Sequence, residues 1–111
     1  MPVNIKQEDG VMIARLEGEI DHHTAGRIRE TIDERMEKTK PRRVELDFSN
    51  VSFMDSSGIG LIMGRYKVIH TLGGTLHVVG VTGAMMKIMR LAGLEKLGVF
   101  DGEVKENEIG Q

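Results

Sequence analysis

The spacing of apolar residues changes several times along this chain, and these changes restrict the fold more than any other feature of the sequence. Val3 and Ile5 alternate with polar residues before Asp9-Gly10, and the alternation resumes at Met12. An Asp-Gly pair between two alternating runs is typical of a β-hairpin. The sequence therefore predicts two antiparallel strands at the start of the fold.

The period becomes helical after Asp21. Apolar residues then recur every three or four positions, at Ala25, Ile28, Ile32 and Met36. The other faces of this helix carry charged residues, namely Arg27, Arg29, Asp33, Glu34 and Lys38. Asp21 is a typical N-cap residue, and Pro41 stands beyond the expected end. This segment is predicted to be an amphipathic helix.

Strict alternation returns at Val44, Leu46 and Phe48, whose neighbours are charged. This pattern predicts a strand with one buried and one solvated face, so we expect helices to cover only one side of the sheet. We expect the strand to end in a turn around Ser49-Asn50.

The second half of the chain again shows the patterns of a strand, a helix and a strand, in that order. VSFMDSSGIG is interpreted as a strand, a loop and the start of a helix that Gly73-Gly74 ends. A strand containing Leu76, Val78, Val79 and Val81 follows. Thr82 is expected to cap a short helix that stops before Gly93, and residues 94–100 supply a last apolar segment.

The predicted order is ββαβαβα, which indicates a single α/β domain. We expect a mixed, mainly parallel β-sheet that is opened by a β-hairpin and covered by helices mainly on one face. The domain is predicted to span residues 2–100, and residues 101–111 are expected to form a polar, flexible tail.

Composition narrows the class of partner. The 111 residues include 15 Lys and Arg against 17 Asp and Glu, a net charge of −2 that gives no sign of binding nucleic acid or a membrane. We therefore expect a protein partner. The chain has no cysteine, and it shows neither a signal peptide nor a membrane-spanning run. A cytoplasmic location is expected.

Hydroxyl and carboxylate side chains meet where the middle strand gives way to a helix, at Asp55-Ser56-Ser57. A helix start exposes unpaired N–H groups and a positive dipole end, so it accommodates a phosphate well. The same residues are also ordinary helix caps. Gly58 and Gly60 weaken this helix, which indicates close packing on the sheet or the approach of a partner's backbone.

Enzymatic alternatives have weaker support. Asp21-His22-His23 echoes the opening of a metal-dependent phosphoesterase signature, but adjacent helical histidines point in different directions and further ligands are needed. The segment around Ser56 lacks the first glycine of a hydrolase elbow, and the glycines after it miss the dinucleotide-binding spacing. We expect no catalytic residue, metal or cofactor.

Two runs of the sequence, GEIDHHTAGRIRE and FMDSSGIGLIMGRYKVIHTLGGTLHVVG, resemble the STAS-domain anti-sigma-factor antagonists. The resemblance covers about residues 2–100 in order and spacing. It is closest to the sporulation branch, the anti-sigma-F factor antagonists, because the stress-response antagonists are expected to differ at the pair after Asp21 and to carry Ser-Thr in place of Ser56-Ser57.

The resemblance implies a partner-switching cycle. The unphosphorylated protein would bind an anti-sigma F factor that is also a serine kinase, and would thereby release the sporulation sigma factor. The kinase would phosphorylate Ser56, and a PP2C-type phosphatase would restore the free serine. The remaining residues expected to bind the partner are Asp21, His22, His23, Thr24, Asp55, Ser57, Gly58, Ile59 and Gly60. Residues 21–24 and residues 55–60 each follow a predicted strand, so the two segments are expected to share one edge of the sheet. The free protein is expected to be a monomer.

Overall fold

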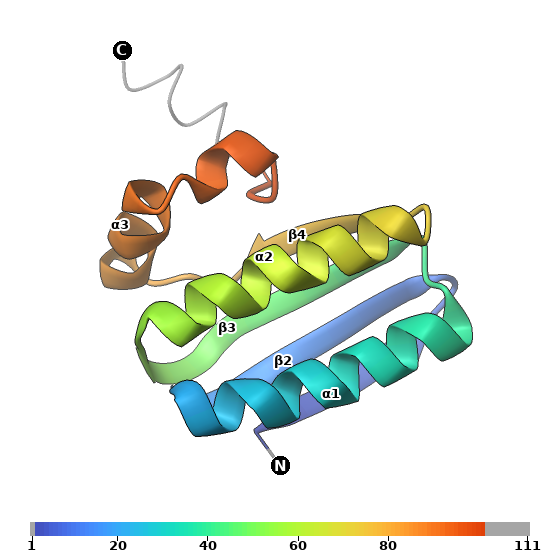
Figure 1. Ribbon diagram of the computed structural model, residues 1–111, viewed down its shortest axis with the longest axis horizontal. Coiled ribbons are helices and arrows are strands. Elements are labelled where there is room, and N and C mark those ends of the chain that lie inside the picture. Colours follow the sequence, from blue (N-terminus) through green and yellow to red (C-terminus); the bar gives the residue numbers. More distant parts are fainter. Residues whose placement is uncertain (1, 102–111) are drawn as a thin grey trace.

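The computed structural model describes residues 2–101, and its elements follow the predicted order. They are β1 (Val3–Glu8), β2 (Val11–Ile20), α1 (His22–Thr39), β3 (Arg43–Met54), α2 (Ser56–Thr71), β4 (Thr75–Val79), α3 (Gly83–Leu91) and a 3₁₀ helix at Leu94–Leu97. Figure 1 shows this arrangement. Asp21, Asp55 and Thr82 cap the three α-helices, so the predicted caps Asp21 and Thr82 are confirmed.

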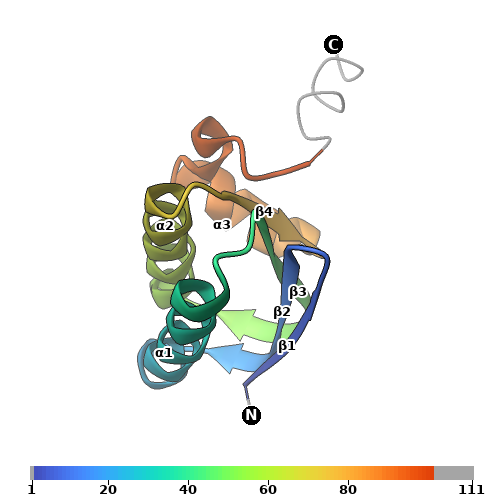
Figure 2. The ribbon, with the colours of Figure 1, turned by 90° about the vertical axis from the view of Figure 1, so that its right-hand side faces the viewer.

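The four strands form one mixed sheet in the order β1-β2-β3-β4. β1 pairs with β2 antiparallel, whereas β2 with β3 and β3 with β4 are parallel. Each parallel connection passes through a helix, and α1 and α2 lie on the same face of the sheet (Figure 2). The predicted mixed sheet, with helices mainly on one face, is confirmed.

The alternating residues of the central strands build the core. Met12 and Ala14 of β2 stand opposite Val44 and Leu46 of β3, and all four are fully buried. The helices cover this row with side chains that recur at helical spacing: Ile28, Ile32, Met36, Leu61, Ile62 and Ile69. Burying this apolar row stabilises the sheet and fixes its register, since a slip of one residue would expose it.

The turn predicted around Ser49-Asn50 is wrong. β3 continues through both residues to Met54 and stays paired with β2 to its end. The register shifts twice along this pair, so extra β3 residues are accommodated as irregularities and the pairing survives. The predicted last strand is shorter than expected, because Gly80 takes a φ of 69° and β4 ends at Val79.

The sheet face without helices carries ion pairs. Arg43 contacts Glu45 at 2.9 Å and Asp101 at 2.6 Å, and His77 Nδ1 lies 2.6 Å from Asp101 Oδ1. Val78 N–H also donates to the Val99 carbonyl, so residues 99–101 run along the β4 side of the sheet. Except for Asp101, the predicted tail at residues 101–111 lies outside the described residues.

Candidate functional site

The carboxyl ends of the parallel strands and the starts of all three α-helices lie at one end of the molecule (Figure 1). We call residues 21–24 and 55–60, which follow β2 and β3 at this end, the rim. The Asp55 N–H donates to the Ile20 carbonyl at 3.2 Å, so a hydrogen bond joins the two chain segments. The two groups of residues singled out in the sequence therefore lie side by side.

The start of α1 is closed by a reciprocal cap. Asp21 Oδ1 accepts from the N–H groups of His23 at 2.9 Å and Thr24 at 3.0 Å. The Thr24 hydroxyl in turn accepts from the Asp21 N–H at 2.9 Å, which completes a capping box. The Thr24 N–H bond is the main reason that the pKa of Asp21 lies below its ordinary value.

The start of α2 is closed less completely. Asp55 Oδ1 accepts one bond, from the Ser57 N–H at 2.8 Å. The third helical residue is Gly58, which has no side chain to return a bond to the cap. Ser56 occupies the first helical position, is exposed, and makes no side-chain hydrogen bond within residues 2–101. Its hydroxyl is therefore accessible from solvent at a helix start.

The two rim glycines differ in their surroundings. A Cβ at Gly58 would overlap the side chain of buried Met54, so this glycine is required by packing. A Cβ at Gly60 would meet nothing within 4 Å. The two explanations offered by the sequence thus separate: close packing accounts for Gly58, and Gly60 leaves open space on the surface.

The two rim histidines lie in the first turn of α1. Both are exposed, and their rings meet edge to face with centroids 5.7 Å apart. Among residues 2–101, no group of three or more His, Asp or Glu side chains is arranged to hold a metal ion. Ile59, by contrast, is half-buried against the core.

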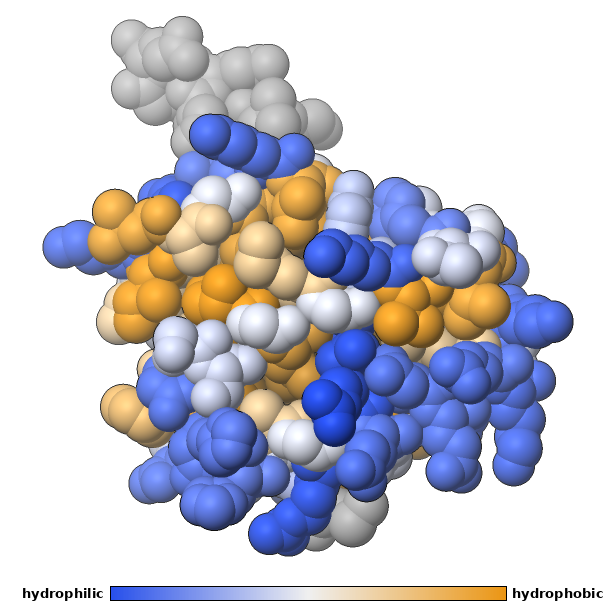
Figure 3. All heavy atoms as spheres, in the orientation of Figure 1, coloured by the Kyte–Doolittle hydropathy of each residue, from blue (hydrophilic) through white to orange (hydrophobic). Residues whose placement is uncertain are grey.

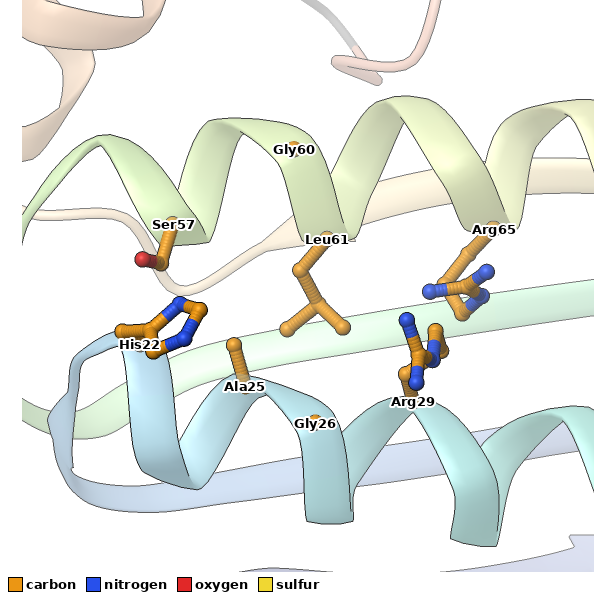
Figure 4. Close-up of a pocket in the computed structure, with 8 residues that line it drawn as sticks. All are labelled: His22, Ala25, Gly26, Arg29, Ser57, Gly60, Leu61 and Arg65. Carbon is orange, nitrogen blue, oxygen red and sulfur yellow. The ribbon is translucent and has the colours of Figure 1, made fainter.

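A groove of about 430 Å³ runs from the rim between α1 and α2. Figure 4 shows the residues that line it: His22, Ala25, Gly26, Arg29, Ser57, Gly60, Leu61 and Arg65. It brings His22 together with Ser57 and Gly60, as the sequence predicted for one surface. Arg29 and Arg65, farther along the groove, were not among the predicted site residues.

Arg65 is a buried cation. It is 5% exposed, and its Nε lies 2.7 Å from Asp33 Oδ1 on α1. Burial raises the pKa of Asp33 and lowers the pKa of Arg65, so desolvation opposes the charged form of each partner. The sequence held one signal for this pair, because Leu61, Arg65 and Ile69 are spaced four apart and place a charge on an apolar helix face.

Apolar surface gathers over α3 in the view of Figure 3. Ile88 and Leu91 of this helix are exposed, Leu91 by 81%, and Met63 of α2 and Phe53 of β3 are exposed as well. Exposed apolar side chains of this size next to a polar rim are typical of surfaces that bind proteins.

Residues 2–107 match the family model described as the STAS domain, and the chain belongs to this family. Its sequence relatives include anti-sigma factor antagonists. The anti-sigma F factor antagonist of Paenibacillus polymyxa is 37% identical over 105 residues, which cover 94% of this chain and 90% of the relative. The anti-sigma-B factor antagonist of Bacillus subtilis is 28% identical over 95 residues, 86% of this chain and 85% of the relative.

Solved structures agree with the fold. The anti-sigma factor antagonist SpoIIAA in its unphosphorylated form matches with a TM-score of 0.77 at 24% identity, over 98% of this chain and 97% of that one. The Bacillus cell fate determinant SpoIIAA in the phosphorylated form matches with a TM-score of 0.71 at 25% identity, over 98% and 99%. No helix within residues 2–101 is long and apolar enough to cross a membrane.

Proposed function

We propose that this protein is an anti-anti-sigma factor of a partner-switching module. Its unphosphorylated form binds an anti-sigma F factor serine kinase and thereby releases the sporulation sigma factor. The observation that carries the proposal is the position of Ser56, exposed at the first residue of α2 and beside the start of α1. The 37% identity to an anti-sigma F factor antagonist supports the choice of partner.

Ser56 is the phosphate acceptor in this proposal. A phosphate there would lie at the positive end of the α2 dipole, where the Asp55 side chain caps only the Ser57 N–H. The fold should therefore tolerate the modification. The kinase contributes the nucleotide and the catalytic groups, so the protein needs no cofactor and no catalytic residue of its own.

The docking surface is the rim together with the apolar surface of α3. A phosphate adds about 1.5 to 2 negative charges and a bulky group at the centre of this surface. Docking would then bury a charge without a partner, so the complex dissociates. A PP2C-type phosphatase removes the phosphate and restores binding. The cycle takes place in the cytoplasm, and the free protein is a monomer.

Incubation with the kinase and ATP, followed by mass mapping, tests the acceptor. We expect one added phosphate on the peptide that contains Ser56. Ser56→Ala should take up no phosphate and should still bind the kinase, whereas Ser57→Ala, the matched control, should be phosphorylated normally. Phosphate on Ser57 or Thr24 would refute the assignment.

A second candidate is the same role in a stress-response module. The 28% identity to anti-sigma-B factor antagonists of Bacillus subtilis and Staphylococcus aureus favours it, although less than the higher identity favours the sporulation module. Binding measured side by side against a purified anti-sigma F kinase and a purified anti-sigma-B kinase distinguishes the two.

A further inference from the structure

Two arginine side chains face each other across the groove. Arg29 extends from α1 and Arg65 from α2, and their guanidinium groups point toward one another (Figure 4). The like charge of Arg29 is one reason, after burial, that the pKa of Arg65 is lowered. The helices therefore hold two cations close enough to repel each other.

The charge of Asp33 acts on both arginines, but its ion pair is with Arg65. Asp33 contacts Arg65 through Nε, and no carboxylate within residues 2–101 forms an ion pair with Arg29. Glu37, on the next turn of α1, helps burial to raise the pKa of Asp33 through its like charge. It forms no ion pair with either arginine within residues 2–101. The groove wall therefore carries an excess of positive charge although the chain as a whole is negative.

The groove is open along its glycine-lined walls. Leu61 lies between the two helices beside the arginines (Figure 4). The small residues Ala25, Gly26 and Gly60 line the part toward the rim, and a Cβ at either glycine would find nothing within 4 Å. Arg65 is buried and contacts Asp33 through Nε, and its guanidinium group points across the groove toward Arg29, so its terminal N–H groups remain for a ligand (Figure 4). A ligand would find at least one donor group already oriented.

We propose that Arg29 and Arg65 bind an oxyanion in the groove between α1 and α2. A bound pair of oxygens would accept hydrogen bonds from both guanidinium groups and remove their repulsion. A free phosphate and an acidic side chain of a docked protein offer this same chemistry. Binding of either would place a ligand directly behind the rim.

Nuclear magnetic resonance titration of the whole protein tests the site. Sodium phosphate is one probe, and a glutamate blocked at both backbone ends is the other, each added at constant ionic strength against sodium chloride. We expect saturable shifts of the Arg29 and Arg65 Nε–H signals and of the Gly26 and Gly60 amides. Tighter binding of phosphate would identify the ligand of the groove as a free anion. Tighter binding of the glutamate would identify it as an acidic side chain of a docked protein.

Variants decide whether the arginines are responsible. Arg29→Gln, at an exposed position, should weaken binding of the better probe about tenfold, the effect of losing one charge-assisted hydrogen bond. Arg27→Gln, on the same helix but outside the groove, should bind like the parent. Arg65→Lys, which keeps the buried charge, should also weaken binding. No saturable shift with either probe, or equal binding by Arg29→Gln and the parent, would overturn the proposal.

Discussion

The two helix starts at the rim have the same kind of cap and different degrees of closure. At α1, Asp21 and Thr24 bond to each other's backbone and form a complete capping box. At α2, Asp55 accepts from Ser57 alone, and Gly58 has no side chain to accept a bond from the Asp55 N–H as Thr24 does from Asp21 in α1. A glycine that packing requires thus leaves the second helix start incompletely closed.

This difference suits the two helix starts to different roles. The closed start of α1 carries its exposed histidines in a fully capped first turn, at one edge of the docking surface proposed above. The open start of α2 presents the Ser56 hydroxyl and leaves room for a phosphate or for a partner's backbone. Variants at each helix start test this difference.

Charge at the open start should have the largest effect. Phosphorylation of Ser56 should weaken binding of the anti-sigma kinase roughly a hundredfold or more, since it leaves a charge buried and unpaired. Ser56→Asp adds less bulk and should weaken binding by about tenfold. Lys38→Ala, in the last turn of α1, is the control and should bind normally. Calorimetry measures all three, and parent-like affinity of Ser56→Asp would place docking elsewhere.

The two rim glycines should respond in opposite directions. Gly58→Ala forces Met54 to move and should lower the free energy of unfolding by about 1 kcal/mol, because overpacking outweighs the gain in helix propensity. Gly60→Ala meets open space and should raise it by about 1 kcal/mol. Urea denaturation measures both, and changes of equal sign would contradict the packing explanation.

Gly60→Ala also tests docking. Although it should be the more stable protein, it should bind the kinase more weakly if the partner's backbone approaches this turn. Unchanged affinity would remove Gly60 from the docking surface.

Removal of the caps should change the free energy of unfolding by a similar amount. Asp55→Ala should cost about 1 kcal/mol of stability. Asp21→Ala should lower the melting temperature further, since it removes the acceptor of two backbone N–H groups, those of His23 and Thr24, whereas Asp55→Ala removes the acceptor of one. The circular dichroism spectrum should remain native in both. Because Asp21→Ala loses the cap of α1, we expect it to be less stable. Its affinity for the kinase must therefore be measured well below its own melting temperature.

Lowering the pH should have the smallest effect on stability. It should act through Asp21, the cap of α1. Because the pKa of Asp21 is lowered in the folded state, its stabilisation is complete above the unfolded value of about 3.9 and is lost as pH falls through the folded pKa. The difference in melting temperature between the parent and Asp21→Ala should shrink from pH 6 to pH 3. Asp21→Asn, which keeps a capping oxygen, is the control, and a constant difference for Asp21→Ala would contradict the assignment.

Much of the fold could be predicted because hydrophobic periodicity is a local signal. The alternation at Val44 and Leu46 gave β3 its buried face, and the helical spacing of Ile28, Ile32 and Met36 gave α1 its core face. Ser49-Asn50 misled the prediction, since polar residues are typical of turns. Pairing with the long strand β2 overrode that preference, and no local pattern reports such long-range pairing.

At the candidate site, too, local patterns predicted some features and long-range packing determined others. Residues directly after two strands were predicted to meet at one edge, and they do, because topology places the ends of parallel strands together. Arg29 and Asp33 were assigned to the exposed faces of α1, but Asp33 pairs with Arg65 across the helix interface. The pairing depends on how two helices pack, which spacing within one helix does not determine.

The register of β2 against β3 also has a kinetic consequence. β1 and β2 meet through a two-residue turn, whereas Ile20 pairs with Met54 only after all of α1 and most of β3 have been brought back. Pairing of such distant residues follows loop closure and is slow compared with formation of a hairpin or a helix. A newly made chain can therefore acquire its hairpin and α1 before the end of β3, which leads into Ser56, is paired with β2.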